Sequence, residues 1–150
     1  MKVLCDTSVL VPALWKWHAD HAACVTWLLA AVARKIEFFV AAHSLAETYS
    51  VVTRLPTKQR VAPADAWRII EVSILPHAQL IELPSTTYSA VLRDLASRGI
   101  GGGIVYDALI AAAAEIGQVD LLVTGNVSHF ETVWPQGVGR IVSPKTAIAL

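Results

Sequence analysis

Charge is scarce in this 150-residue chain, and the two signs balance. Asp, Glu, Lys and Arg make up 16% of the residues, with 12 basic and 12 acidic side chains. Hydrophobic residues account for 55%, which excludes a disordered chain and predicts a well-buried globular protein. The balanced charge excludes the broad positive field of a typical nucleic-acid-binding protein. Any nucleic acid would have to be held by a local basic patch, a metal ion or the groove of a dimer.

Cysteine is rare as well, and no hydrophobic run is long. Cys5 and Cys24 lie in a strand-like and a helical pattern, which excludes a disulfide framework and favours a cytoplasmic protein. Residues 22–33 are apolar apart from Thr26, but about 20 such residues are needed to cross a bilayer. Asp6 interrupts the N-terminal apolar stretch, so we expect neither a targeting segment nor a membrane span.

Internal repeats and low-complexity linkers are absent, and the length suits a single domain over residues 1–150. Strand-like segments alternate with helical ones, which predicts an α/β fold with a largely parallel sheet covered by helices on both faces. The expected strands are residues 2–6, 36–40, 79–83, 120–124 and 139–143. The expected helices are residues 7–15, 20–34, 43–55, 63–76, 85–98, 104–117 and 127–132.

Proline, serine and glycine mark several borders of these elements. Pro56 is expected to close the third helix, and Pro63 to open the fourth. Ser85 is a candidate N-cap of the fifth helix. Gly117 is expected to end the sixth in the usual C-terminal manner.

Asp6, Thr7 and Ser8 follow directly after the first predicted strand. In an α/β fold the carboxyl ends of parallel strands open into the ligand crevice. Asp6 could cap the helix that follows, or it could face a ligand while Thr7 or Ser8 caps instead. Both interpretations fit the residue types.

Glu47 lies in the third predicted helix, where polar and apolar side chains separate. At 100° per residue, Glu47, Ser50 and Arg54 share one face. A lone Glu on a helix is usually solvated, but this polar stripe could also face the crevice, with Arg54 placed for a phosphate. The opposite, apolar face consists of Leu45, Tyr49 and Val52.

Asp107 lies in a predicted helix that is apolar nearly all round, as in a helix buried on most sides. An ionised carboxylate there is costly unless it meets a cation or several donors. A first-turn acid favoured by the helix dipole is the alternative.

Asn126 follows the strand ending at Thr124 and is either a turn residue or a ligand through its amide oxygen. Thr124 could donate a hydrogen bond to Asp6.

Acids brought together from distant parts of a chain repel one another, and a hard divalent cation is the usual reason to tolerate this. The histidines show no metal-ligand spacing, and His129 beside Phe130 is interpreted as structural. Trp15, Trp17 and Trp67 could mark a protein–protein surface, because aromatic residues are enriched there.

Four segments in this order resemble the PIN-domain ribonucleases, in particular the VapC-type toxins of type II toxin–antitoxin pairs. The segments are LCDTS at 4–8, SLAETY at 44–49 running to RLP at 54–56, GGIVYDALIA at 102–111 and LVTGNVSHF at 122–130. The resemblance implies an α/β/α sandwich around a parallel sheet of about five strands. It also implies a Mg²⁺ or Mn²⁺ site built from Asp6, Glu47 and Asp107. The family often has another Asp near the fourth segment, where this chain has only Asn126 in the neighbourhood and one negative charge fewer. A single tightly bound ion is therefore expected.

The activity that the resemblance implies is hydrolysis of RNA phosphodiester bonds by a water that the ion activates. Thr7, Ser8 and Thr124 would orient the carboxylates, Asn126 would complete the site, and Arg54 would contact a phosphate. A homodimer would lengthen the RNA groove, and a cognate antitoxin protein would be the partner.

Three alternatives remain open. A PIN-type nuclease could act on DNA, or process RNA without an antitoxin. A PIN fold could serve only as a scaffold, although a scaffold has no reason to keep clustered acids. A receiver domain could use Thr124 and Lys145, but it needs an Asp after the middle strand, and residues 83–85 offer none.

Overall fold

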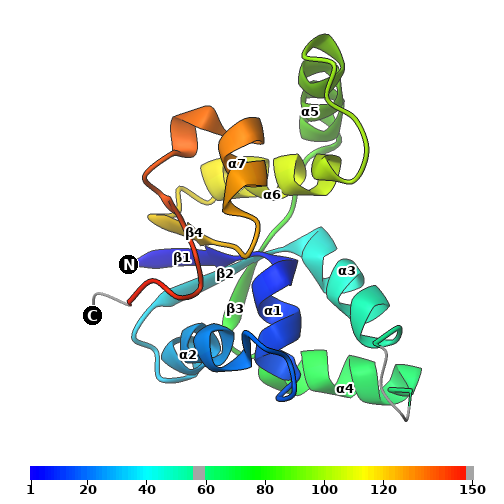
Figure 1. Cartoon of the computed structure of the whole chain (residues 1–150), viewed down its shortest axis with the longest axis vertical. Coiled ribbons are helices and arrows are strands. Elements are labelled where there is room, and N and C mark those ends of the chain that lie inside the picture. The colour runs from blue at the N-terminus through cyan, green and yellow to red at the C-terminus, as the bar shows by residue number, and fades with distance from the viewer. Residues whose placement is uncertain (56–59, 148–150) are drawn as a thin grey trace.

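The computed structural model describes residues 1–55 and 60–147, so Pro56 and the border predicted there lie outside the described residues. Strands and helices alternate along these residues (Figure 1). The strands are β1 (Lys2–Cys5), β2 (Glu37–Ala41), β3 (Ala78–Ile81), β4 (Leu121–Val123) and β5 (Ile141–Val142). The helices are α1 (Thr7–Leu14), α2 (His21–Val32), α3 (Ala42–Val52), α4 (Pro63–Ser73), α5 (Ser85–Ser97), α6 (Ile104–Ile116), α7 (Val127–Val133) and the short 3₁₀ helix η1 (Pro135–Gly137).

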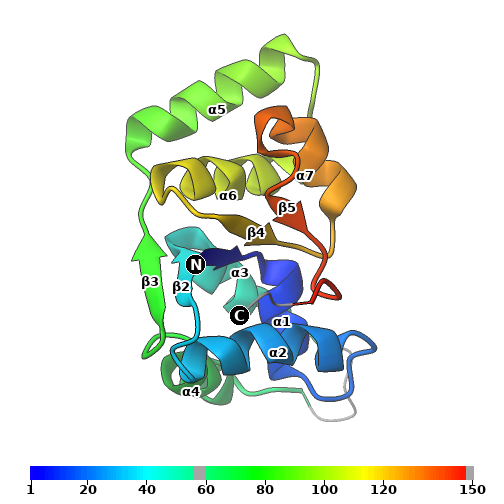
Figure 2. The ribbon, with the colours of Figure 1, turned by 90° about the vertical axis from the view of Figure 1, so that its left-hand side faces the viewer.

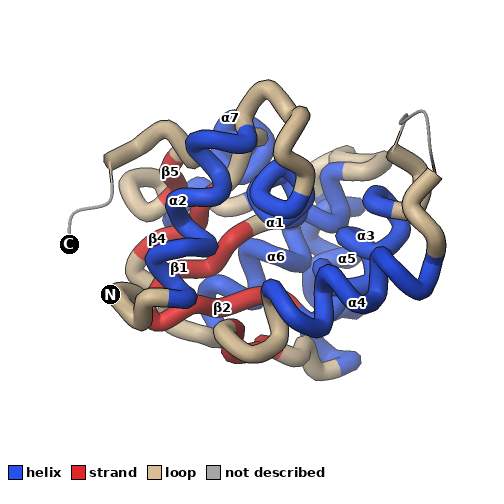
Figure 3. Tube along the Cα trace, turned by 90° about the horizontal axis from the view of Figure 1, so that it is seen from below, coloured by secondary structure: helices blue, strands red, loops and turns tan. Residues whose placement is uncertain are grey.

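The sheet has the strand order β3-β2-β1-β4-β5, and every neighbouring pair is parallel. The strands form one continuous layer between the helices (Figure 3). The chain first builds outward from β1 to β2 and β3, and then returns to place β4 on the other side of β1. Ligands of open α/β sheets bind at such a reversal, outside the carboxyl ends of the strands.

Alternation along the central strands produces two cores. Val3 and Cys5 of β1 face one core, and Leu4 faces the other. The first core packs against α1, α2 and α4, and the second against α6 and α7. Figure 2 shows the resulting layers, with α5 outside α6. The predicted α/β fold with a five-stranded parallel sheet is therefore confirmed, and the predicted borders differ from the observed ones by at most three residues. The 3₁₀ helix η1 was not expected.

Two border predictions need correction. Gly117 does lie at the end of α6, but its φ of −74° is ordinary, and Gln118 takes the left-handed conformation at φ 48°. A Cβ at this position would lie 2.5 Å from Cδ1 of Ile81, so glycine leaves room for that side chain. Ser85 is the first helical residue of α5, and Pro84 occupies the N-cap position without a side-chain cap. Pro63 opens α4 as predicted.

The buried face of α3 also differs from the expected one. The buried side chains are Ser44, Thr48 and Val52, whereas Tyr49 is 37% exposed. Small hydroxyl side chains allow α3 to approach α1 and β2 closely, and a tyrosine ring would not fit there. Ser44 Oγ and Thr48 Oγ1 are buried without a hydrogen-bond partner among the described residues.

None of the helices in the described part of the chain combines the length and the apolar character needed to cross a membrane.

Candidate active site

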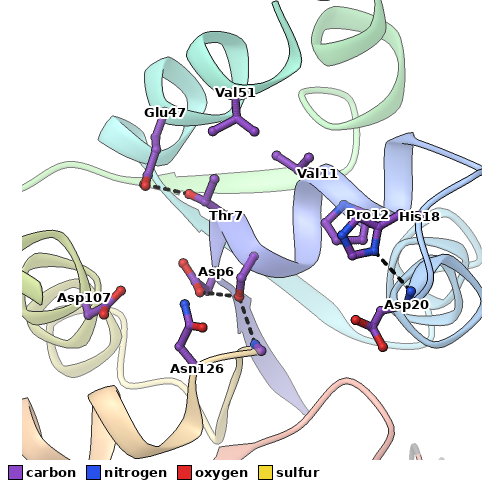
Figure 4. A pocket seen from close by; sticks show the side chains of 12 residues that line it. Asp6, Thr7, Val11, Pro12, His18, Asp20, Glu47, Val51, Asp107 and Asn126 are labelled. Carbon is purple, nitrogen blue, oxygen red and sulfur yellow. Dashed lines mark hydrogen bonds between the residues drawn. The ribbon is translucent and has the colours of Figure 1, made fainter. Parts of the chain in front are cut away.

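A pocket of about 410 Å³ opens where the strand order reverses, beside the carboxyl end of β1. Asp6 after β1, Glu47 on α3 and Asp107 on α6 all line it (Figure 4). Three elements that are far apart in the sequence thus bring one carboxylate each to the same pocket.

Asp6 takes the N-cap position of α1, but its side chain caps nothing. Its backbone carbonyl accepts hydrogen bonds from the first turn of the helix, while the carboxylate turns into the pocket. Oδ2 accepts hydrogen bonds from Ser8 Oγ at 2.5 Å and from Thr124 Oγ1 at 2.9 Å. Both donors bind the same oxygen, so Oδ1 stays available to a ligand. The side chain is fixed by these bonds, and the residue is 3% exposed.

The loop after β4 is tied to the first turn of α1 by the same hydroxyl groups. The backbone N–H of Gly125 donates to Ser8 Oγ at 2.8 Å, and that of Asn126 donates to Thr124 Oγ1 at 2.9 Å. A Cβ on Gly125 would lie 3.3 Å from Ser8 Oγ, so a small residue suits this close approach. The position of Asp6 therefore depends on hydrogen bonds that span most of the chain.

Glu47 and Asp107 are each held by a different neighbour. Thr7 Oγ1 donates to Glu47 Oε2 at 2.8 Å. Asp107 lies in the first turn of α6 with its side chain 13% exposed, and Oδ2 lies 3.0 Å from Nδ1 of His129 on α7. Burial and the charges of Asp6 and Glu47 raise the pKa of Asp107, although the contact with His129 opposes this. The charges of Asp6 and Glu47 thus reach Asp107, although burial is the larger cause of the raised pKa.

The carboxylates are not gathered around one point. Within residues 1–55 and 60–147, no three His, Cys, Asp or Glu side chains are close enough to form a ready-made metal cluster. Each acid is instead held by its own partner. Repulsion between the like charges favours keeping the three carboxylates apart. The donor set nevertheless fits a hard divalent cation, because carboxylate oxygens are its preferred ligands and Oδ1 of Asp6 accepts no hydrogen bond within the described ranges.

The other two sequence candidates occupy different places. Asn126 lines the pocket with Asp6 and Asp107. Arg54 does not line it: the side chain is exposed beyond the end of α3, and Nε donates to the carbonyl of Ser50 at 3.0 Å. Arg54 and Arg60 line a separate, smaller pocket.

Several histidines near the pocket were missed by sequence reasoning. His129 contacts Asp107, so its interpretation as merely structural was incomplete. Its position three residues after Asn126 on a short helix was the available signal. His18 lines the other end of the pocket together with Asp20. His43 has a pKa lowered by burial, which the nearby charge of Asp6 opposes.

The structure and the sequence both match known proteins. Ribonuclease VapC27 of Mycobacterium tuberculosis is 45% identical over 109 residues, which cover 73% of this chain and 74% of that protein. The crystal structure of Mycobacterium tuberculosis VapC20, a Sarcin-Ricin loop cleaving toxin, has a TM-score of 0.63 at 14% identity over 81% of this chain and 87% of that chain. The crystal structure of VapBC2 from Rickettsia felis, bound to a DNA fragment from its promoter, has a TM-score of 0.63 at 19% identity. The match covers 95% of this chain and 97% of that chain.

The two solved structures share the fold of this protein. The family comes from the sequence: the PIN domain model matches residues 3–133, which include Asp6, Glu47, Asp107 and the loop after β4. The chain belongs to the PIN domain family.

Proposed function

We propose that this protein is a divalent-metal-dependent endoribonuclease that hydrolyses RNA phosphodiester bonds, and that it is the toxin of a toxin–antitoxin pair. The observation that carries the proposal is the convergence of Asp6, Glu47 and Asp107 on one pocket at the sheet reversal. The 45% identity to a ribonuclease supports the substrate class. A single PIN-like domain over residues 1–150 would carry the whole activity.

The ion would be Mg²⁺ or Mn²⁺, held by Asp6 and Asp107 and by Glu47 directly or through a water. When bound, it supplies charge neutralisation and lowers the pKa of water. One tightly bound ion is expected, because Asn126 adds an amide oxygen but no negative charge to the pocket.

The protein's own groups have separate tasks in this proposal. Ser8 and Thr124 hold Oδ2 of Asp6, so Oδ1 would be the oxygen that binds the ion. Thr7 holds one oxygen of Glu47, which leaves the other to accept a proton from the attacking water. Asn126 would complete the site. Arg54 would contact a phosphate of a longer substrate, beyond the pocket.

The proposed partners follow from the family. A cognate antitoxin protein is proposed because VapBC2 of Rickettsia felis shares the fold. A homodimer would extend the RNA groove of a chain whose net charge is zero. The site of action would be the cytoplasm.

The test is cleavage of a pool of structured and single-stranded RNAs with Mg²⁺, Mn²⁺ or EDTA. We expect metal-dependent cutting by the wild type, and its loss in Asp6→Asn and Asp107→Asn. Asp65→Asn is the matched control, since Asp65 is an exposed acid in the first turn of α4. Equal cutting by all four proteins would point to a contaminating nuclease and contradict the proposal.

A further inference from the structure

The pocket continues along α1, away from the three acids. Val11 and Pro12 line its middle, and His18 and Asp20 line its far end, in the loop of residues 15–20 that connects α1 with α2 (Figure 4). Eight helical residues span about 12 Å. The loop lies at the end of the pocket away from the three acids, where a substrate seated in the pocket would reach it.

His18 is held in one orientation and one tautomer. The backbone N–H of Asp20 donates to Nδ1 of His18 at 3.1 Å. The proton of the neutral ring must then be on Nε2, which becomes a hydrogen-bond donor. The ring packs edge-on against Trp15 with centroids 5.7 Å apart, and backbone hydrogen bonds from His18 to Trp15 and from His21 to His18 fix the loop.

Trp17, the residue before His18, is 74% exposed, more than any other large hydrophobic residue of the described chain. Nζ of Lys16 lies 4.4 Å from the centroid of the Trp17 ring. Nζ of Lys145 lies 3.2 Å from Oδ1 of Asp20, so this lysine is paired with an acid of the same loop. The pocket thus has three acids at one end and His18 with Asp20 at the other. Trp17 and Lys16 precede His18 in the same loop, outside the lining of the pocket.

An exposed indole beside cations is the combination with which proteins hold single-stranded nucleic acid, by base stacking and by attraction of the backbone. Resting on the proposed ribonuclease function, we propose that loop 15–20 is a nucleotide subsite. Trp17 stacks on an unpaired base of the bound strand, and Nε2–H of His18 donates to the RNA backbone. A local site of this kind supplies the binding that the zero net charge of the chain does not.

Trp17→Ala tests the stacking part with an RNA that the wild type cuts. Because stacking stabilises ground and transition states alike, KM should rise about 5- to 100-fold while kcat changes less than about twofold. Trp67→Ala is the matched control: Trp67 is a 48% exposed tryptophan on α4, outside loop 15–20. Anisotropy of a short fluorescein-labelled single-stranded RNA in EDTA should show the same loss of affinity, and a duplex RNA should show none.

His18→Phe and His18→Gln test the hydrogen bond. Phe keeps the ring without a donor, whereas Gln keeps an N–H at a similar reach, so Gln should restore at least part of the affinity that Phe loses. Thermal unfolding of both variants separates lost binding from lost folding, since Phe also leaves the N–H of Asp20 without its acceptor.

The outcomes separate this inference from the proposed function. If the wild type cuts RNA and Trp17→Ala behaves as Trp67→Ala does, the subsite is wrong and the loop is better explained as a protein-binding surface. If the wild type neither binds nor cuts RNA, the proposed function and the subsite both fail. If both His18 variants bind RNA as tightly as the wild type does, the proposed hydrogen bond is wrong and the stacking by Trp17 is unaffected.

Discussion

Asp107 is a residue whose charge works against the stability of the fold. Its pKa is raised, with burial as the first cause and the charges of Asp6 and Glu47 adding to it. The folded state therefore holds the proton more tightly than the unfolded chain does. The contribution of this group to stability is fully present below the ordinary value of 3.8 and is lost as the pH rises through the folded pKa. At pH 7 the ionised carboxylate therefore lowers the free energy of unfolding.

Asp107→Asn should therefore make the protein more stable while it removes the activity. We expect a gain of about 1 kcal/mol in the free energy of unfolding at pH 7, or roughly 2–4 °C in Tm. Urea unfolding at pH 7 and at pH 4 measures it, and the gain should shrink at the lower pH as the wild-type carboxyl takes up its proton. Asp65→Asn should show no such gain, and a less stable Asp107→Asn at pH 7 would contradict the argument.

At the scale of elements, one buried hydroxyl joins segments from both ends of the chain. Thr124 follows β4, donates to Asp6 before α1, and accepts from the N–H of Asn126 before α7. Thr124 is fully buried, so neither bond can be replaced by water. The direction of the Asp6 carboxylate depends on this contact.

Thr124→Val should keep the shape of the side chain and remove both hydrogen bonds. Positions that orient a metal-binding carboxylate typically change activity or metal affinity by about 10- to 100-fold, so we expect a loss of this size in kcat/KM. Thr124→Ser keeps the hydroxyl and should recover most of it. Circular dichroism of the folded variants provides the control, and equal activity of the Val and Ser variants would show that the bond to Asp6 does not matter.

The elements were predictable from the sequence, whereas their contacts were predictable only in part. The borders of strands and helices follow from the periodicity of the hydrophobic residues and from border residues such as Pro63, which opens α4. The buried face of α3 did not follow, because small hydroxyl groups at Ser44 and Thr48 are buried where the pattern placed Tyr49. The place of His18 in the pocket depends on how the loop after α1 folds back. Local patterns do not encode such packing.

At the scale of the whole molecule, a bound ion would join groups from β1, α3 and α6. Anything that binds the folded state alone stabilises it, by about 2.7 kcal/mol at a concentration one hundred times Kd. Mg²⁺ or Mn²⁺ should therefore raise Tm by roughly 5–10 °C, and EDTA should reverse this. Scanning calorimetry of the wild type and Asp6→Asn makes the comparison. An equal rise in both proteins would place the ion elsewhere.

The central position of β1 also bears on how the protein is made. β1 is synthesised first, yet its neighbour β4 begins only at Leu121. The hydrogen bond between Asp6 and Thr124 joins residues 118 positions apart. Pairing across such a separation is slow and comes late in folding. A nascent chain on the ribosome therefore carries all three acids without the geometry that would let them act, and the site is completed only after most of the chain has emerged.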